Sequence, residues 1–200
     1  MCSLLSNDLG VSLPLHISLS RPLALKTDQK DGFLNAMKEA IRKSKLEVFK
    51  ISFKELEWHP NEDHTRWFLV LRVADEQNQL SQLLSKSNAV ASHYQQPKLY
   101  VDDEDQGPGR MRQSQAHREQ KGVSVANKFH ISIAWSLSAP SGSREAVRKK
   151  RDESQEEQMD LPESVTSLEI PFNEVKVRIG QDVSSLPLHP KRRKASGVFS

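Results

Sequence analysis

The sequence predicts an α+β fold in which helices back an antiparallel sheet. Several short segments alternate apolar and polar residues, which is typical of strands, and two longer segments repeat apolar residues every three or four positions, which is typical of amphipathic helices. These segments follow one another in the order β-α-β-β-α-β-β. The chain has 200 residues, of which 36% are hydrophobic and 28% are charged. We therefore expect one domain with a single sizeable core.

The first half predicts a strand, a helix and a hairpin. Residues 13–20 alternate as a strand, and Asp28 or Asp31 can cap the helix that follows. The core-facing stripe of this helix repeats every fourth residue as Phe33, Met37 and Ile41. Residues 46–57 and 65–74 predict two strands joined by a turn. The second of these strands places on one face Trp67, Leu69, Leu71 and Val73.

The second half predicts another helix, over residues 77–92, and then more strands. The core positions of this helix are Leu80, Leu83, Leu84 and Val90. Residues 128–136 predict a strand, and alternation returns between residues 168 and 179. Two polar stretches near residues 101–127 and 138–160 have no apolar period; we expect surface insertions there, the second with a solvated helix as an alternative.

Two of the predicted strands carry the same motif, His16-Ile17-Ser18 and His130-Ile131-Ser132. Side chains alternate across a strand, so the histidine and serine of each motif share one face. The opposite face of the second strand is apolar, with Phe129, Ile131, Ile133 and Trp135. Two such strands side by side would join a neutral imidazole that accepts a proton to an imidazolium that donates one. A single histidine of this kind is more often only a hydrogen-bonded strand residue, but two matched copies favour phosphodiester chemistry.

On these residues the chain resembles the two-histidine (2H) phosphoesterases, and within them the branch that trims the end of U6 small nuclear RNA. Residues 16–22 and 129–135 carry the resemblance, with Ala134 where the superfamily has Ser or Thr, followed by Trp135 as in this branch. Residues 57–73 and 175–180 are also similar. The chain resembles a fungal-type member that is short at its N-terminus, which would leave a strand edge unpaired.

The resemblance implies a bilobal fold, with two antiparallel sheets lining a central groove and helices outside. It implies a leader at residues 1–12, a phosphodiesterase domain at 13–187 and a basic disordered tail at 188–200. The implied catalytic residues are His16 and His130, with His130 as base and His16 as acid, although the two near-symmetric motifs leave that order open. The implied phosphate ligands are Ser18 and Ser132. The candidates for substrate binding are Ser20, Arg21 and Tyr100, with Tyr94 competing with Tyr100 and Trp135 assigned to the core.

The activity that the resemblance implies is a metal-independent exonuclease working from the 3′ end of RNA. It would trim the oligouridine end of U6 small nuclear RNA, leave a 2′,3′-cyclic phosphate and support pre-mRNA splicing. Two alternatives remain. One is a cyclic phosphodiesterase acting on small 2′,3′-cyclic nucleotides, and the other is a catalytically inactive RNA-binding homologue.

Composition and charge restrict the kinds of metal, cofactor and binding partner that we expect. We expect no metal and no cofactor, because His59 and His64 flank a turn without completing a ligand set, and we expect the remaining histidines to be solvated. No apolar run approaches the ~18 residues of a membrane span, so we expect no membrane partner. The net charge is +3, with basic runs at residues 148–151 and 190–194. The second run predicts a nuclear import receptor as partner and a nuclear location; we expect a monomer that binds RNA.

Overall fold

The computed structural model describes residues 1–61, 63–101, 128–138 and 161–191. The insertions expected near residues 101–127 and 138–160 and both basic runs lie largely outside these residues. The chain forms two compact units, described separately below. The first consists of Met1–Ser18, Ser52–Glu76 and Pro108–Glu169, and the second of Leu19–Ile51, Gln77–Gly107 and Ile170–Ser200. Among the described residues no helix combines the length and the apolar character needed to cross a membrane.

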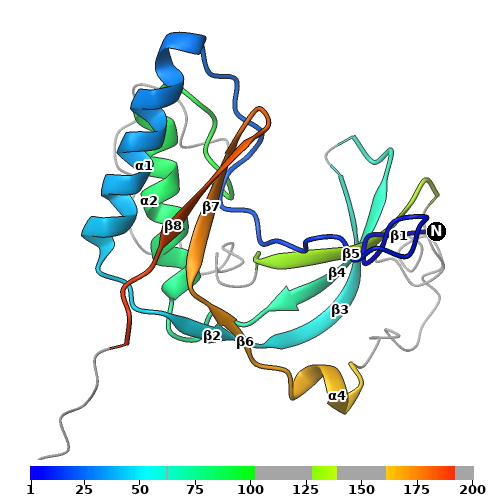
Figure 1. Cartoon of the computed structure of the whole chain (residues 1–200). Coiled ribbons are helices and arrows are strands. Elements are labelled where there is room, and N and C mark those ends of the chain that lie inside the picture. Colours follow the sequence, from blue (N-terminus) through cyan, green and yellow to red (C-terminus); the bar gives the residue numbers. More distant parts are fainter. Residues whose placement is uncertain (62, 102–127, 139–160, 192–200) are drawn as a thin grey trace, which may run out of the picture. The chain divides into compact units, whose positions relative to one another are not determined.

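The first unit is built on a four-stranded antiparallel sheet with the strand order β1-β5-β4-β3 (Figure 1). These strands are β1 (Cys2–Ser3), β3 (Phe53–Pro60), β4 (Trp67–Val73) and β5 (His130–Ser136), and a short helix α4 (Glu163–Thr166) belongs to the same unit. The predicted hairpin of β3 and β4 is confirmed. Asn61 closes its turn, because the side-chain oxygen accepts hydrogen bonds from the backbone N–H groups of Thr65 and Arg66 at 2.9 and 3.0 Å.

A β-bulge in β5 changes which residues share a face. Leu69 of β4 pairs with Ala134, but its neighbour Val70 pairs with Ser132, so Ile133 is an extra residue in β5. Strict alternation along β5 is therefore broken at Ile133. Ala134, and not Ile133, follows Ile131 into the core, and each of these two buried side chains is 6% exposed.

The bulge also turns Trp135 onto the face that carries the second motif. Directly opposed residues of neighbouring strands share a face. The partners of the alternate β4 residues Arg72, Val70 and Phe68 are His130, Ser132 and Trp135 respectively. We call the face with these six residues the motif face. The assignment of Trp135 to the apolar face was wrong, because it assumed an uninterrupted strand.

The first motif does not lie in a strand, contrary to the prediction for residues 13–20. Residues 13–18 have no regular secondary structure. β5 pairs with β4 on one side and with β1 on the other, over Ala134 and Trp135. The predicted leader thus supplies a two-residue strand to one edge of β5. Pro14 has no backbone N–H to give to a ladder, which further disfavours a strand through this segment.

The second unit contains the two predicted helices, α1 (Lys30–Ser44) and α2 (Gln79–His93), which pack against each other. The predicted stripes are buried: Phe33, Met37 and Ile41 on α1, and Leu80, Leu83, Leu84 and Val90 on α2. Neither candidate aspartate caps α1. Its N-cap residue is Gln29, while Asp28 lies in a preceding 3-10 turn, η1 (Thr27–Gln29), and Asp31 lies in the first turn of the helix.

Two antiparallel strand pairs complete the second unit: β2 (Phe49–Ile51) with β6 (Ile170–Phe172), and β7 (Glu174–Ile179) with β8 (Asp182–Pro187). The rings of Phe49 and Phe172 stack with their centroids 5.0 Å apart. The single strand predicted for residues 46–57 is divided at Ser52, where the chain passes from the second unit to the first. The alternation predicted for residues 168–179 corresponds to β6 and β7.

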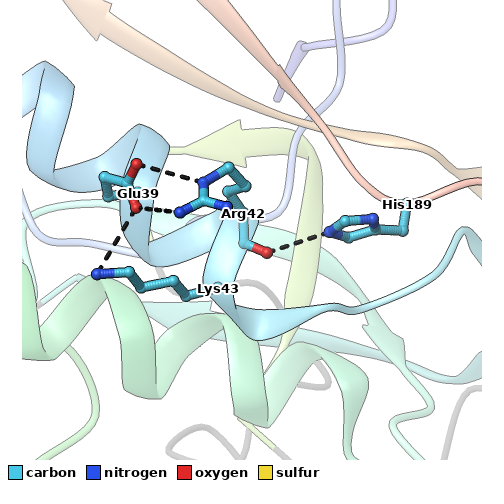
Figure 2. A network of polar contacts seen from close by, with 4 residues as sticks. All are labelled: Glu39, Arg42, Lys43 and His189. Carbon is cyan, nitrogen blue, oxygen red and sulfur yellow. Dashed lines mark hydrogen bonds and ion pairs between the residues drawn. The ribbon is translucent and has the colours of Figure 1, made fainter.

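The C-terminal part of the second unit stays packed beyond the boundary expected at residue 187. Leu188 is buried. His189 is exposed, as expected, and its Nε2 lies 3.1 Å from the carbonyl oxygen of Arg42 in the last turn of α1 (Figure 2). Since that carbonyl can only accept, Nε2 donates, and His189 satisfies one of the backbone oxygens that a helix end leaves without an internal partner.

Candidate active site

His130, at the start of β5, is half-buried on the motif face. Its Nδ1 lies 3.0 Å from the backbone carbonyl oxygen of Lys128. A carbonyl oxygen has no proton to donate, so Nδ1 must be the donor. In the neutral ring the proton therefore sits on Nδ1 and the lone pair on Nε2. This tautomer presents Nε2 as a proton acceptor.

The same carbonyl oxygen is held by a second donor, Arg72, which lies opposite His130 in the register of β4 and β5. The Arg72 guanidinium donates to the Lys128 oxygen at 3.1 Å and also forms an ion pair with the Glu57 carboxylate. Both side chains are largely buried, with exposed fractions of 16% for Arg72 and 10% for Glu57. Glu57, Arg72, Lys128 and His130 thus form one connected polar network.

Burial lowers the pKa of His130 below its ordinary value of 6.5. The hydrogen bond to the Lys128 carbonyl and the Glu57 carboxylate oppose this shift of the His130 pKa, while the charges of Arg72 and His16 add to it. The net effect favours a neutral imidazole near pH 7. A neutral half-buried imidazole is suited to accept a proton.

His16 lies in the same unit as His130, and the charge of His16 lowers the pKa of His130. His16 and Ser18 are both exposed, whereas Ser132 is half-buried on the motif face. The four motif residues therefore all belong to the first unit, although only one of the two motifs lies on a strand.

A third histidine lies beside His130. His59 of β3 pairs with Phe68, which places it on the motif face, and the ring centroids of His59 and His130 are 6.0 Å apart. The sequence reading treated His59 as a turn residue. The alternation of Glu55, Glu57 and His59 along β3 was the signal that could have placed it on the sheet. Among the described residues, no three His, Cys, Asp or Glu side chains come together in a way that could hold a metal ion.

Trp135, on the motif face, is in contact with the cationic side chain of Arg66. The guanidinium carbon of the exposed Arg66 lies 5.2 Å from the centroid of the Trp135 ring, which is the geometry of a cation–π contact. The pair combines an aromatic surface with a positive charge. RNA bases and phosphates bind to groups of these two kinds.

The remaining candidates, Ser20, Arg21 and Tyr100, belong to the second unit. Tyr100 has a positive φ of 59°. The residue before it, Leu99, is held through its backbone N–H and C=O by the side chain of Asn88, at 2.9 Å each.

The competing candidate Tyr94 packs inside the second unit. Its ring meets Phe33 edge-on with the centroids 5.4 Å apart. A Cβ added at Gly32 would lie 2.8 Å from the Tyr94 hydroxyl oxygen. Tyr94 thus has a packing role between α1 and α2, and both Tyr94 and Tyr100 are half-buried.

The chain is similar to a protein family, to a curated protein and to solved structures. The model of the HVSL family, described as "Uncharacterised conserved protein", matches residues 1–187. A curated protein of Neurospora crassa, "U6 snRNA phosphodiesterase 1", is 32% identical over 205 residues, covering 92% of this chain and 50% of the relative. The chain therefore spans about half the length of that relative.

Two solved structures of Kluyveromyces marxianus Usb1 are similar in fold. One has a TM-score of 0.59 at 19% identity, and the other, with uridine monophosphate, has a TM-score of 0.60 at 21% identity. Each match covers 93% of this chain and 80% of the solved chain. The predicted α+β class with antiparallel sheets is confirmed by this likeness and by the strand pairing.

Proposed function

Because this chain belongs to the HVSL family, we propose that it is an RNA phosphodiesterase that shortens the oligouridine 3′ end of U6 small nuclear RNA. The name of the Neurospora crassa relative supports the substrate, and the uridine monophosphate in one similar structure is consistent with a uridine-containing end. The observation that carries the proposal is the state of His130: a half-buried imidazole, held as the Nδ1–H tautomer, beside the charge of a second motif histidine.

The reaction would use a nucleophile within the RNA. His130 Nε2 removes the proton from the 2′-hydroxyl of the penultimate nucleotide, whose oxygen attacks the adjacent 3′ phosphorus. His16, as imidazolium, gives a proton to the 5′-oxygen of the terminal nucleoside as its bond to phosphorus breaks. The products are the free terminal nucleoside and a shortened RNA with a 2′,3′-cyclic phosphate. This mechanism needs no metal and no cofactor.

The serines of the two motifs would stabilise the phosphoryl group. The hydroxyls of Ser18 and Ser132 donate to its non-bridging oxygens, where charge changes as the new bond forms. Arg21, Ser20 and Tyr100 would bind the substrate outside the reacting phosphate. In this proposal His130 is the base, because burial favours its neutral form, and His16 is therefore the acid.

The decisive experiment compares two oligouridines that differ at one atom. The first is all-ribose, and the second lacks the 2′-hydroxyl of the penultimate nucleotide. We expect the first to be shortened to a cyclic-phosphate end and the second to bind but resist cleavage. Comparable cleavage of both would show that water is the nucleophile and would contradict the mechanism.

The same assay separates the two alternative functions. Turnover of a small 2′,3′-cyclic nucleotide without trimming of oligouridine would indicate a cyclic phosphodiesterase. RNA binding without any product would indicate an inactive RNA-binding homologue. His93→Ala is a suitable control variant, because His93 is exposed on α2 in the second unit.

We also propose that the protein acts as a monomer in the nucleus and reaches it through an import receptor that reads the basic run at residues 190–194. Replacing the lysines and arginines of this run with alanine should leave the protein outside the nucleus, as seen with a fluorescent fusion. Nuclear accumulation of that variant would contradict the proposed signal.

A further inference from the structure

The ion pair of Glu57 and Arg72 has no part in the proton transfers described above, although it lies inside the candidate site. Its groups are largely buried, and it connects two neighbouring strands on the motif face. Burying an ion pair contributes little stability compared with apolar side chains of similar size, because both charges must leave water. A role beyond stability is therefore worth seeking at this position.

We propose that Glu57 and Arg72 are positioning residues for His130: together they hold the Lys128 carbonyl oxygen against His130 Nδ1 and so keep Nε2 as the proton acceptor. The proposal rests on the proposed function, because it assigns these residues to the base of that reaction. It concerns the state of His130 itself, so it can be tested without any RNA.

The geometry gives each member of the network one task. The Lys128 oxygen has two lone pairs, and it accepts from His130 Nδ1 at 3.0 Å and from Arg72 at 3.1 Å. Arg72 reaches this oxygen while its guanidinium also donates to Glu57. Glu57 thereby fixes the plane of the guanidinium, and the guanidinium fixes the carbonyl group.

Arginine is suited to this task because its planar fork donates in several fixed directions at once, whereas lysine offers one compact charge on a flexible stem. A lysine at position 72 would keep the positive charge beside His130 and a partner for Glu57. It would not hold both Glu57 and the Lys128 oxygen in one plane. The Arg72→Lys variant therefore separates orientation from charge.

The titration of His130 gives a second measurement, in which two variants should shift its pKa in opposite directions. Arg72 and His16 lower the pKa of His130, Glu57 raises it, and His59 faces the ring from β3. Loss of the cation in Arg72→Gln should therefore move the titration of His130 to higher pH. Loss of the carboxylate in Glu57→Gln should move it to lower pH. Each shift shows that the charge acts on His130 through space, and the tautomer separates positioning from this effect of charge.

The test follows the ring nitrogens of His130 by NMR in the full chain, as a function of pH, with the imidazole labelled with ¹⁵N. The wild-type ring should be in the Nδ1–H form when neutral. Arg72→Lys, Arg72→Gln and Glu57→Gln should each lose that single tautomer, because the Glu57–Arg72 pair then no longer holds the Lys128 oxygen against Nδ1. A matched control is Arg42→Gln, which removes the exposed Glu39–Arg42 ion pair of Figure 2 in the second unit and should leave His130 unchanged.

Activity gives a parallel measurement. On oligouridine, Arg72→Lys should lower kcat by about 10- to 100-fold, the size typical of losing a partner that orients a functional histidine, and leave KM nearly unchanged. If Arg72→Gln fails to fold, the result for Arg72→Lys decides the test, because lysine keeps the positive charge beside His130 and a partner for Glu57.

The two proposals fail in different ways. An unchanged Nδ1–H tautomer of His130 in a folded Arg72→Lys or Glu57→Gln variant would overturn the positioning role. If the wild-type protein cleaves no RNA while the variants alter the tautomer as described, the proposed function fails and the positioning role stands.

Discussion

Removal of His130 should separate catalysis from folding. In His130→Ala the general base is lost, and the expected fall in rate is about 10²- to 10⁴-fold. That corresponds to about 2.7 to 5.4 kcal/mol in the barrier. The imidazole is half-buried at the start of β5 and contributes one hydrogen bond to the backbone.

The cost to stability should be much smaller. A single hydrogen bond contributes about 1 kcal/mol net, and the larger penalty arises only when a buried partner is left unsatisfied. Here the Lys128 carbonyl oxygen keeps the guanidinium of Arg72 at 3.1 Å after the imidazole is removed. We therefore expect His130→Ala to lose about 1 kcal/mol of folding free energy while activity falls by two orders of magnitude or more.

The assay measures release of uridine from an all-ribose oligouridine under single-turnover conditions, with urea unfolding of the same preparations. His93→Ala, with its exposed side chain outside the first unit, should match the wild type in both measurements. Near-native cleavage by His130→Ala would refute the assignment of His130 as the base. A rate loss accompanied by complete unfolding would refute the argument that Arg72 protects the carbonyl.

Three further predictions concern the serines, the pH profile and the tyrosine loop. Ser18→Ala and Ser132→Ala should slow turnover by about 10- to 100-fold, as expected for losing a preorganised donor, with a smaller change in RNA affinity measured by fluorescence anisotropy; equal losses in both would indicate a ground-state contact only. Because the pKa of His130 lies below 6.5, the rising limb of kcat/KM against pH should have its midpoint below 6.5, and a midpoint above that value would contradict the assignment. Asn88→Ala should destabilise the loop that carries Tyr100 by about 1–3 kcal/mol, since two backbone hydrogen bonds lose their partner; unchanged thermal unfolding and unchanged hydrogen exchange in that loop would disprove the clamp.

The elements with strong local signals could be predicted from the sequence. The stripes of α1 and α2 depend only on which residues recur on one helix face, and the β3–β4 hairpin depends on the turn around Asn61. The predicted strand at residues 13–20 is wrong: residues 13–18 have no regular secondary structure, and the strand that pairs with β5 at Ala134 and Trp135 is β1. Periodicity alone carries no information about which edge is already paired.

The site residues divide in the same way: some could be predicted from the sequence and others could not. The matched motifs predicted His16 and His130 as site residues, and both lie in the first unit. The contribution of Arg72 could not be read from the sequence, because it depends on the register between β4 and β5, and the proximity of His59 depends on the pairing of β3 with β4. Register is set by the packing of whole strands, so residues that are distant in the chain become neighbours only in the folded sheet.

The extra residue in β5 also determines how the motif could be redesigned. A designer who wished to restore the third hydroxyl of the superfamily pattern would write Ser in place of Ala134. At that position the side chain is 6% exposed and turned toward the core, so the new hydroxyl would be buried away from the motif face. The residue that follows His130 and Ser132 on the motif face is Trp135. The bulge at Ile133 thus places an indole, with a guanidinium beside it, where an uninterrupted strand would place Ala134.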